Sequence, residues 1–186
     1  MLPQPIFTIV SSNKRILIHL YPHPLPTTMK RPKIGDIIEI PTRHGFAYAQ
    51  FTHKHSMYGA LLRVYNTIYQ TKQSLDVIQS VVNTREPDFS TFFPLGAAVN
   101  RCIVSVVGNA TIPEKQKPFP LFRNGVVDPK TKKVETWWLW DGEKEWCIGK
   151  LTKEQRRLPL NEVWNDTLLV ERIESGWTPE TDQTKL

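Results

Sequence analysis

Residues 35–65 read GDIIEIPTRHGFAYAQFTHKHSMYGALLRVY, and they hold the clearest strand pattern of the chain. Residues 35–41 are a short β-branched run that Gly-Asp opens and Pro41 closes, which is typical of a strand. Residues 46–51 and 58–65 have the same β-branched, aromatic and alternating character. Three strands in succession predict a strongly bent antiparallel meander. We expect an α+β fold that is mostly β, either a small bent antiparallel sheet or an SH3-like partial barrel, with one or two helices.

Two later segments carry helical spacing. In residues 74–82, SLDVIQSVV, Ser74 stands in the capping position and apolar residues follow at the spacing of one helix face. Apolar residues between 160 and 174 also approximate one helical stripe, although the β-branched run around Val170 would suit a strand. We favour a helix there, and both assignments stay open.

The two cysteines lie in apolar stretches. Cys102 falls within residues 97–107, which predict a strand, and Cys147 within residues 144–149, which predict another. Residues 113–120 are spaced by prolines and predict a long crossing loop between them. Neither the number nor the spacing of the cysteines suggests a disulfide framework, so we expect buried free thiols in the cytoplasm.

The chain divides by composition into three parts. Residues 1–28 hold five prolines and no acidic residue, and we expect a weakly ordered N-terminal extension. Two alternatives stay open for it, because Met29 could equally be the natural start of the protein. Residues 29–177 predict a single β-rich domain, and residues 178–186, which are polar, predict a flexible tail.

The positive charge is concentrated at one end. The formal net charge is +6, but residues 1–33 carry five basic and no acidic side chains, which leaves 19 basic and 18 acidic residues for the rest. Basic clusters at 130–133 and 153–157 are candidates for nucleic-acid contacts, yet such clusters are more typical of solvated loops. A nearly neutral body makes nucleic acid an unlikely partner. No apolar run approaches the roughly 20 residues that cross a bilayer, so we expect no membrane contact.

Catalytic patterns are missing from the sequence. There is no glycine-rich phosphate loop, no Gly-x-Ser-x-Gly and no His-Glu-x-x-His. His53 and His55 would share one face of a strand and could hold a divalent metal together with His44, but no acid or cysteine stands nearby in sequence to complete the ligands. We therefore expect no enzyme, no catalytic residue, no metal and no cofactor.

A tryptophan-rich hairpin is the strongest candidate for binding. Residues 134–140 and 144–149 flank Asp141-Gly142, and a two-residue loop would pair Trp140 with Glu143 and Trp138 with Glu145. Alternation then places Trp138 and Trp140 beside Glu143 and Glu145 on one face, which predicts a partner-binding patch. The opposite face, directed to the core, would hold Trp137, Leu139, Trp146 and Ile148. The alternative is that another layer, such as the C-terminal helix, covers Trp138 and Trp140.

Several segments in the same order resemble the immunity protein 26 family. They are KIGDIIEIP at 33–41, GFAYAQ at 45–50, Tyr58-Gly59, PFPLF at 118–122, Leu158-Pro159 and the apolar segment 168–176. The resemblance spans about residues 29–177. It implies a cytoplasmic antidote of a bacterial polymorphic toxin system, which neutralises a cognate protein toxin by direct binding without catalysis. The alternative function is an SH3-like nucleic-acid-binding or regulatory module.

Overall fold

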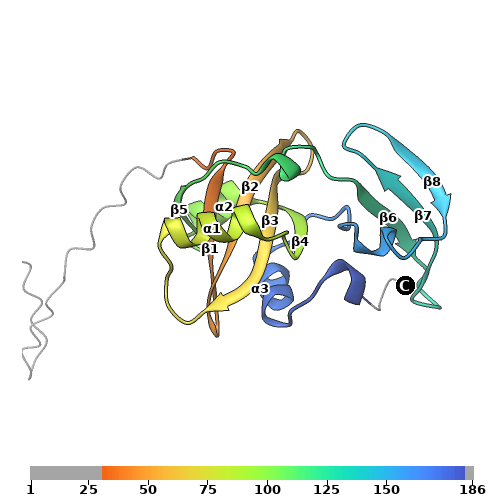
Figure 1. Ribbon diagram of the computed structural model, residues 1–186. Coiled ribbons are helices and arrows are strands. Elements are labelled where there is room, and N and C mark those ends of the chain that lie inside the picture. The colour runs from red at the N-terminus through yellow and green to blue at the C-terminus, as the bar shows by residue number, and fades with distance from the viewer. Residues whose placement is uncertain (1–30, 183–186) are drawn as a thin grey trace, which may run out of the picture.

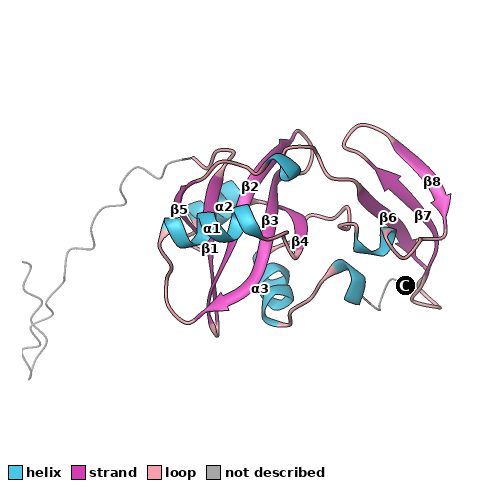
Figure 2. Cartoon of the chain, viewed as in Figure 1, coloured by secondary structure: helices cyan, strands magenta, loops and turns pink. Residues whose placement is uncertain are grey.

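The computed structural model describes residues 31–182, which form a mostly β, α+β arrangement (Figures 1 and 2). Two antiparallel sheets have the strand orders β4-β3-β2-β1-β5 and β6-β7-β8. The strands are β1 (Asp36–Thr42), β2 (Gly45–His55), β3 (Gly59–Tyr69), β4 (Phe89–Phe93), β5 (Ser105–Asn109), β6 (Phe122–Val127), β7 (Val134–Trp140) and β8 (Glu145–Gly149). The helices are α1 (Leu75–Thr84), α2 (Leu95–Asn100) and α3 (Asp166–Glu174), with 3-10 turns η1 (Glu114–Gln116), η2 (Gln155–Arg157) and η3 (Pro179–Thr181). The larger sheet is open, so within residues 31–182 there is no closed barrel.

The predicted three-stranded meander is confirmed as β1, β2 and β3. A tight turn joins β1 to β2, with Thr42 opposite Gly45, and β2 pairs with β3 through two register shifts that bend the ladder. Gly45 has φ +134°, and a Cβ there would lie 2.1 Å from the Tyr69 carbonyl oxygen. A glycine is therefore required at this turn.

Strand alternation gives the five-stranded sheet two different faces. One face is apolar and packs against α2 and α3, around residues such as Ile38, Val64 and Leu169. On the other face, Tyr48 of β2 packs against Ile78 of helix α1 in a smaller cluster. Burial of these side chains is the main stabilising term, at about 1.5–3 kcal/mol for each fully buried large apolar side chain.

The second face also holds polar side chains that fix the crossing segment 110–118. Gln50 Nε2 donates to the Ala110 carbonyl oxygen at 2.9 Å. Arg63 Nη2 donates to the carbonyl oxygens of Gln116 and Pro118 at 3.1 and 3.2 Å. These bonds satisfy backbone groups that have no sheet partner, and they set where the chain enters the second sheet.

Three sequence expectations change in the structure. The strand predicted for 97–107 is helix α2 followed by the short β5, because Leu95, Ala97 and Ala98 are good helix formers. The helix predicted within residues 160–174 is shorter than expected, because α3 spans only Asp166–Glu174. The Asn165 side chain caps this helix by accepting the Leu168 N–H at 2.8 Å. The expected flexible tail instead includes η3, and Asp182 is buried.

Both cysteines are exposed, contrary to the prediction of buried thiols. Cys102 lies in the turn after α2 with φ +56°, and Cys147 lies on the sheet-edge strand β8. The predicted N-terminal extension, residues 1–28, and the tail residues 183–186 lie outside the described residues. Among residues 31–182, no helix has both the length and the apolar character needed to cross a bilayer.

Candidate functional site

The predicted hairpin is present, with a wider turn than expected. β7 and β8 pair so that Trp140 faces Glu145, Leu139 faces Trp146 and Trp138 faces Cys147. Four residues, 141–144, make the connection, because the Asp141 carboxylate accepts the backbone N–H groups of Glu143 and Lys144 at 2.9 and 2.7 Å. The predicted pairing is therefore wrong by two residues along β8. A shift of two preserves which side chains share a face.

Trp140 is a core residue and not part of an exposed patch. Its side chain is 8% exposed and lies in a cluster with Leu61, Phe92 and Phe122. The Trp140 ring centroid lies 5.1 Å from that of His55 and 5.5 Å from that of Phe122. The layer that covers Trp140 thus comes from the large sheet, with His55 and Tyr58 at the β2–β3 turn and Phe92 of β4, whereas the residues of α3 belong to a different cluster.

Trp138 is exposed. Its side chain is 41% exposed, and the strand register places it between Asn124 of β6 and Cys147 of β8 on one face. Glu145 belongs to the same face, where Asn124 Nδ2 donates to its carboxylate at 3.0 Å. Glu143 is exposed in the turn. The structure therefore brings Trp138 and Glu145 together, with Glu143 beyond the end of the strand.

Trp146 was assigned to the core by alternation and is 40% exposed. It faces the buried Leu139, but β8 is the edge strand of its sheet and has β7 as its one neighbour among residues 31–182. Alternation reports the face of a strand and not whether a layer covers that face. The position of β8 at the edge is the signal that sequence reasoning missed.

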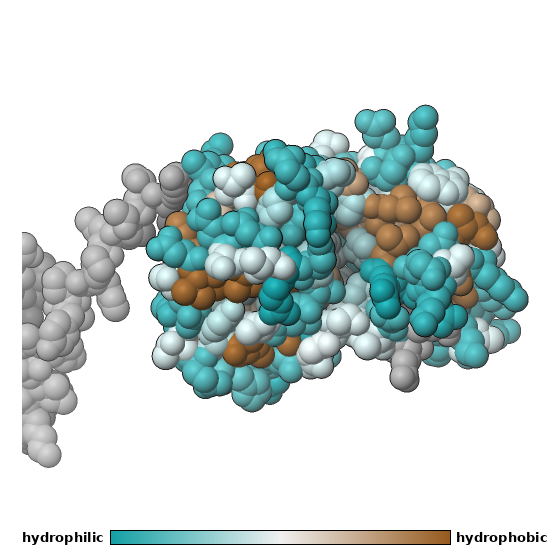
Figure 3. All heavy atoms as spheres, in the orientation of Figure 1, coloured by the Kyte–Doolittle hydropathy of each residue, from teal (hydrophilic) through white to brown (hydrophobic). Residues whose placement is uncertain are grey.

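We call the group of Trp138, Glu145, Trp146 and Cys147 the β8 edge surface. Two large indoles and a thiol are exposed here around a strand with a free side. Figure 1 shows β8 at the margin of the molecule, and Figure 3 shows apolar side chains gathered over the small sheet. Trp138 and Cys147 lie on one face of this edge and Trp146 lies on the other, so exposed apolar groups flank the unpaired strand on both faces.

Charge differs between the small sheet and the segment that follows it. Residues 122–157 carry nine basic and six acidic side chains, whereas residues 158–182 carry one basic and six acidic. The basic cluster at 130–133 lies in the loop between β6 and β7, and the cluster at 153–157 lies at η2. Residues 34–182 as a whole carry equal numbers of each sign.

The two histidines of β2 make structural contacts. His53 Nε2 lies 2.8 Å from the Lys117 carbonyl oxygen, and His55 Nε2 lies 3.3 Å from that of Gly142. Both rings approach Phe119, as expected for side chains on one face of a strand. Residues 31–182 contain no group of three or more His, Cys, Asp or Glu side chains placed to hold a metal ion.

Burial lowers the pKa of the His53 imidazole below its ordinary value. The hydrogen bond to the Lys117 carbonyl oxygen opposes this change, and the Arg63 guanidinium adds to it. The neutral imidazole donates through Nε2 to the Lys117 carbonyl oxygen, and this hydrogen bond connects β2 to the crossing segment.

Comparison of the chain with family models, with curated proteins and with solved structures gives no match.

Proposed function

We propose that this protein is a non-catalytic binding protein whose protein partner docks on the β8 edge surface. The free side of β8 carries this proposal, because alternate backbone N–H and C=O groups of an edge strand point away from its neighbour and can pair with an extended segment of another chain. Trp138 and Trp146 lie on opposite faces beside that edge. Their indole rings would contact the two faces of an added strand and supply contact area.

β8 carries only part of the protection that edge strands usually have, namely its short length and a bulge near its end. Proline, a bulge in the middle of the strand or inward charges usually blunt an exposed edge. The sequence of β8, EWCIG, has one charged residue at its start and apolar residues after it. Lys144 and Lys150 stand outside its two ends. A register shift between the Trp138–Cys147 and Trp137–Gly149 pairs places Ile148 in a bulge, so the regular part of the free edge is residues 145–147.

The resemblance to the immunity protein 26 family supports a bacterial toxin as the partner. In that proposal the protein stays in the cytoplasm and blocks its cognate toxin by stoichiometric contact. Two of the residues that carry the resemblance, Gly35 and Gly45, have φ of +93° and +134° and hold turns of the meander. These conformations give two glycines of the resembling segments a structural role in the meander, while the β8 edge surface supports the binding role.

A second candidate, nucleic-acid binding, draws on the nine basic side chains of residues 122–157. Residues 34–182 carry as many acidic as basic side chains, which argues against nucleic-acid binding, because phosphate contacts need a surplus of positive charge on the binding face. Retention on nucleic acid that falls steeply with salt would favour this candidate over the first.

Co-purification with the product of the neighbouring gene tests the proposal. We expect the wild-type protein to retain one protein partner, and the Trp138→Ser/Trp146→Ser variant to lose it while keeping the wild-type unfolding midpoint. Val126→Ser is the matched control, because Val126 is 87% exposed on β6 at the opposite edge of the same sheet. Equal capture by all three proteins would refute the assignment of this surface.

A further inference from the structure

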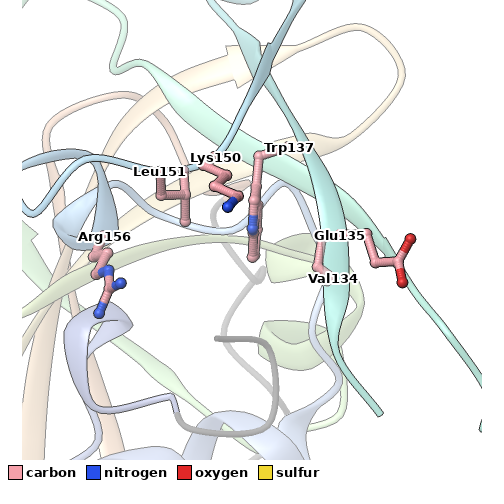
Figure 4. A pocket seen from close by; sticks show the side chains of 6 residues that line it. All are labelled: Val134, Glu135, Trp137, Lys150, Leu151 and Arg156. Carbon is pink, nitrogen blue, oxygen red and sulfur yellow. The ribbon is translucent and has the colours of Figure 1, made fainter. Parts of the chain in front are cut away.

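A pocket of about 460 Å³ lies on the side of the small sheet opposite Trp138. Figure 4 shows it between β7 and the chain that follows β8. Its lining residues are Val134, Glu135, Trp137, Lys150, Leu151 and Arg156. The buried Trp137 ring forms one wall, and the volume falls within the range of small-molecule sites in proteins.

The charged groups around this pocket are mostly positive. Lys150 extends from the end of β8 toward the Trp137 ring, and Arg156 stands across from it on η2, whereas the Glu135 carboxylate points away (Figure 4). Arg157 is paired with Glu180 at 3.1 Å, but Lys150 and Arg156 make no ion pair or hydrogen bond through their side chains within residues 31–182. Two unpaired cations therefore share one opening.

A third cation lies behind the tryptophan. Arg123 has no exposed surface, and its guanidinium lies 5.1 Å from the centroid of the Trp137 ring. Its Nη2 donates to the Pro179 carbonyl oxygen, while Nε and Nη1 have no hydrogen-bond partner. Burial lowers the pKa of Arg123, the Asp182 and Glu162 carboxylates oppose this change, and the nearby Arg156 adds to it. An added negative charge would offset this repulsion.

We infer that this pocket binds a small oxyanion, a carboxylate or a phosphate monoester, that carries an apolar body. The oxyanion would lie between Lys150 and Arg156, whose N–H donors suit carboxylate and phosphate oxygens. The apolar body would pack on Trp137, Val134 and Leu151. This site is separate from the β8 edge surface, and the inference goes beyond the proposed function without resting on it.

Phenyl phosphate is the probe for the test, with benzyl alcohol as the uncharged comparison. Each is titrated into the ¹⁵N-labelled full chain while the six assigned tryptophan indole N–H resonances are followed. We expect phenyl phosphate to move the Trp137 resonance saturably and to leave Trp138 unmoved. Benzyl alcohol should bind at least about tenfold more weakly, because it lacks the charge that the two cations attract.

The variants Lys150→Met and Arg156→Met test whether phenyl phosphate binds in this pocket and not elsewhere on the surface. Each variant should weaken phenyl phosphate binding by about fivefold or more, as expected for loss of a charge-assisted bond. Lys153→Met, an exposed lysine in the same connection that does not line the pocket, should bind within about twofold of wild type. A Trp137 resonance that stays fixed, equal binding of the two probes, or equal losses in all three variants would overturn the inference.

Discussion

The imidazole of His55 lies edge-on against the indole of Trp140, with ring centroids 5.1 Å apart and planes at 83°. His55 Nδ1 accepts the N–H groups of Met57 and Tyr58, each at 3.3 Å, which leaves Nε2–H to donate to the Gly142 carbonyl oxygen. This contact joins the β2–β3 hairpin of the large sheet to the β7–β8 turn of the small one. The two tryptophans of the hairpin face, Trp138 and Trp140, thereby have different roles.

Trp140→Ala should destabilise the protein strongly, whereas Trp138→Ala should not. Removing the buried Trp140 ring leaves a cavity among aromatic side chains, at a cost of about 3–5 kcal/mol in the free energy of unfolding. Trp138 is 41% exposed, and its loss should cost under about 1 kcal/mol. Urea unfolding followed by circular dichroism measures both. Similar costs for the two variants would show that the hairpin faces are assigned incorrectly.

Stability should fall as the pH drops through the mildly acidic range. The folded-state pKa of His53 is lowered, so the unfolded chain binds a proton more readily than the folded one. The contribution of His53 is therefore complete above its unfolded pKa of about 6.5 and is lost as pH falls from there toward the lower folded value. Unfolding midpoints at a series of pH values test this.

The His53→Gln variant is the control for that pH series. Its amide can donate to the Lys117 carbonyl oxygen without titrating, so the variant should show a shallower loss of stability between pH 7 and pH 5 than wild type. An identical slope in the two proteins would remove His53 as a source of the pH dependence.

Gly45→Ala and Gly96→Ala should have opposite outcomes. A Cβ at Gly45 would clash with the Tyr69 carbonyl oxygen in a backbone conformation that L-residues avoid, and we expect a loss of about 2 kcal/mol or more. Gly96 lies in helix α2 with open space around its Cα, so alanine there should be neutral or stabilise by up to about 1 kcal/mol. Thermal unfolding of both variants, side by side, measures the contrast. A harmless Gly45→Ala would contradict the tight β1–β2 turn.

Arg63→Met should loosen the crossing segment without unfolding the sheets. The variant loses the two bonds to the carbonyl oxygens of Gln116 and Pro118 while keeping much of the side-chain volume. We expect trypsin to cut faster after Lys115, which becomes accessible when the segment detaches, whereas the Lys117–Pro118 bond resists trypsin in both proteins. Arg85→Met removes a surface arginine from the end of α1 and should leave this cleavage rate unchanged. Unchanged cleavage in Arg63→Met would show that other contacts hold the segment.

The local elements that carry their own pattern could be predicted from the sequence. The meander at 35–65 has alternation and turn residues together, and residues 74–82 have both a cap and an apolar stripe, so these elements were placed correctly. α2 was missed because a short apolar run suits a strand as well as a helix. β4 and β6 were not assigned. β4 pairs with β3 across the intervening helix α1, and β6 forms a hairpin with the next strand β7 but contains Asn124-Gly125, which is typical of a turn.

The candidate site could be predicted only in part. The hairpin and the exposure of Trp138 follow from local pattern, but the turn width depends on the Asp141 carboxylate holding two backbone N–H groups. Which of Trp140 and Trp146 is covered depends on how the two sheets meet, and no spacing within the hairpin encodes that contact. The pocket beside Trp137 also joins residues from β7 and η2, which no local pattern links.

Amide hydrogen–deuterium exchange of β8, with and without the co-purified partner, shows whether a partner strand pairs with this edge. We expect the amides of Glu145–Gly149 on the free side to exchange rapidly in the isolated protein and to become protected in the complex, as an added strand requires. Protection confined to another surface, such as α3, with β8 amides unchanged, would contradict it.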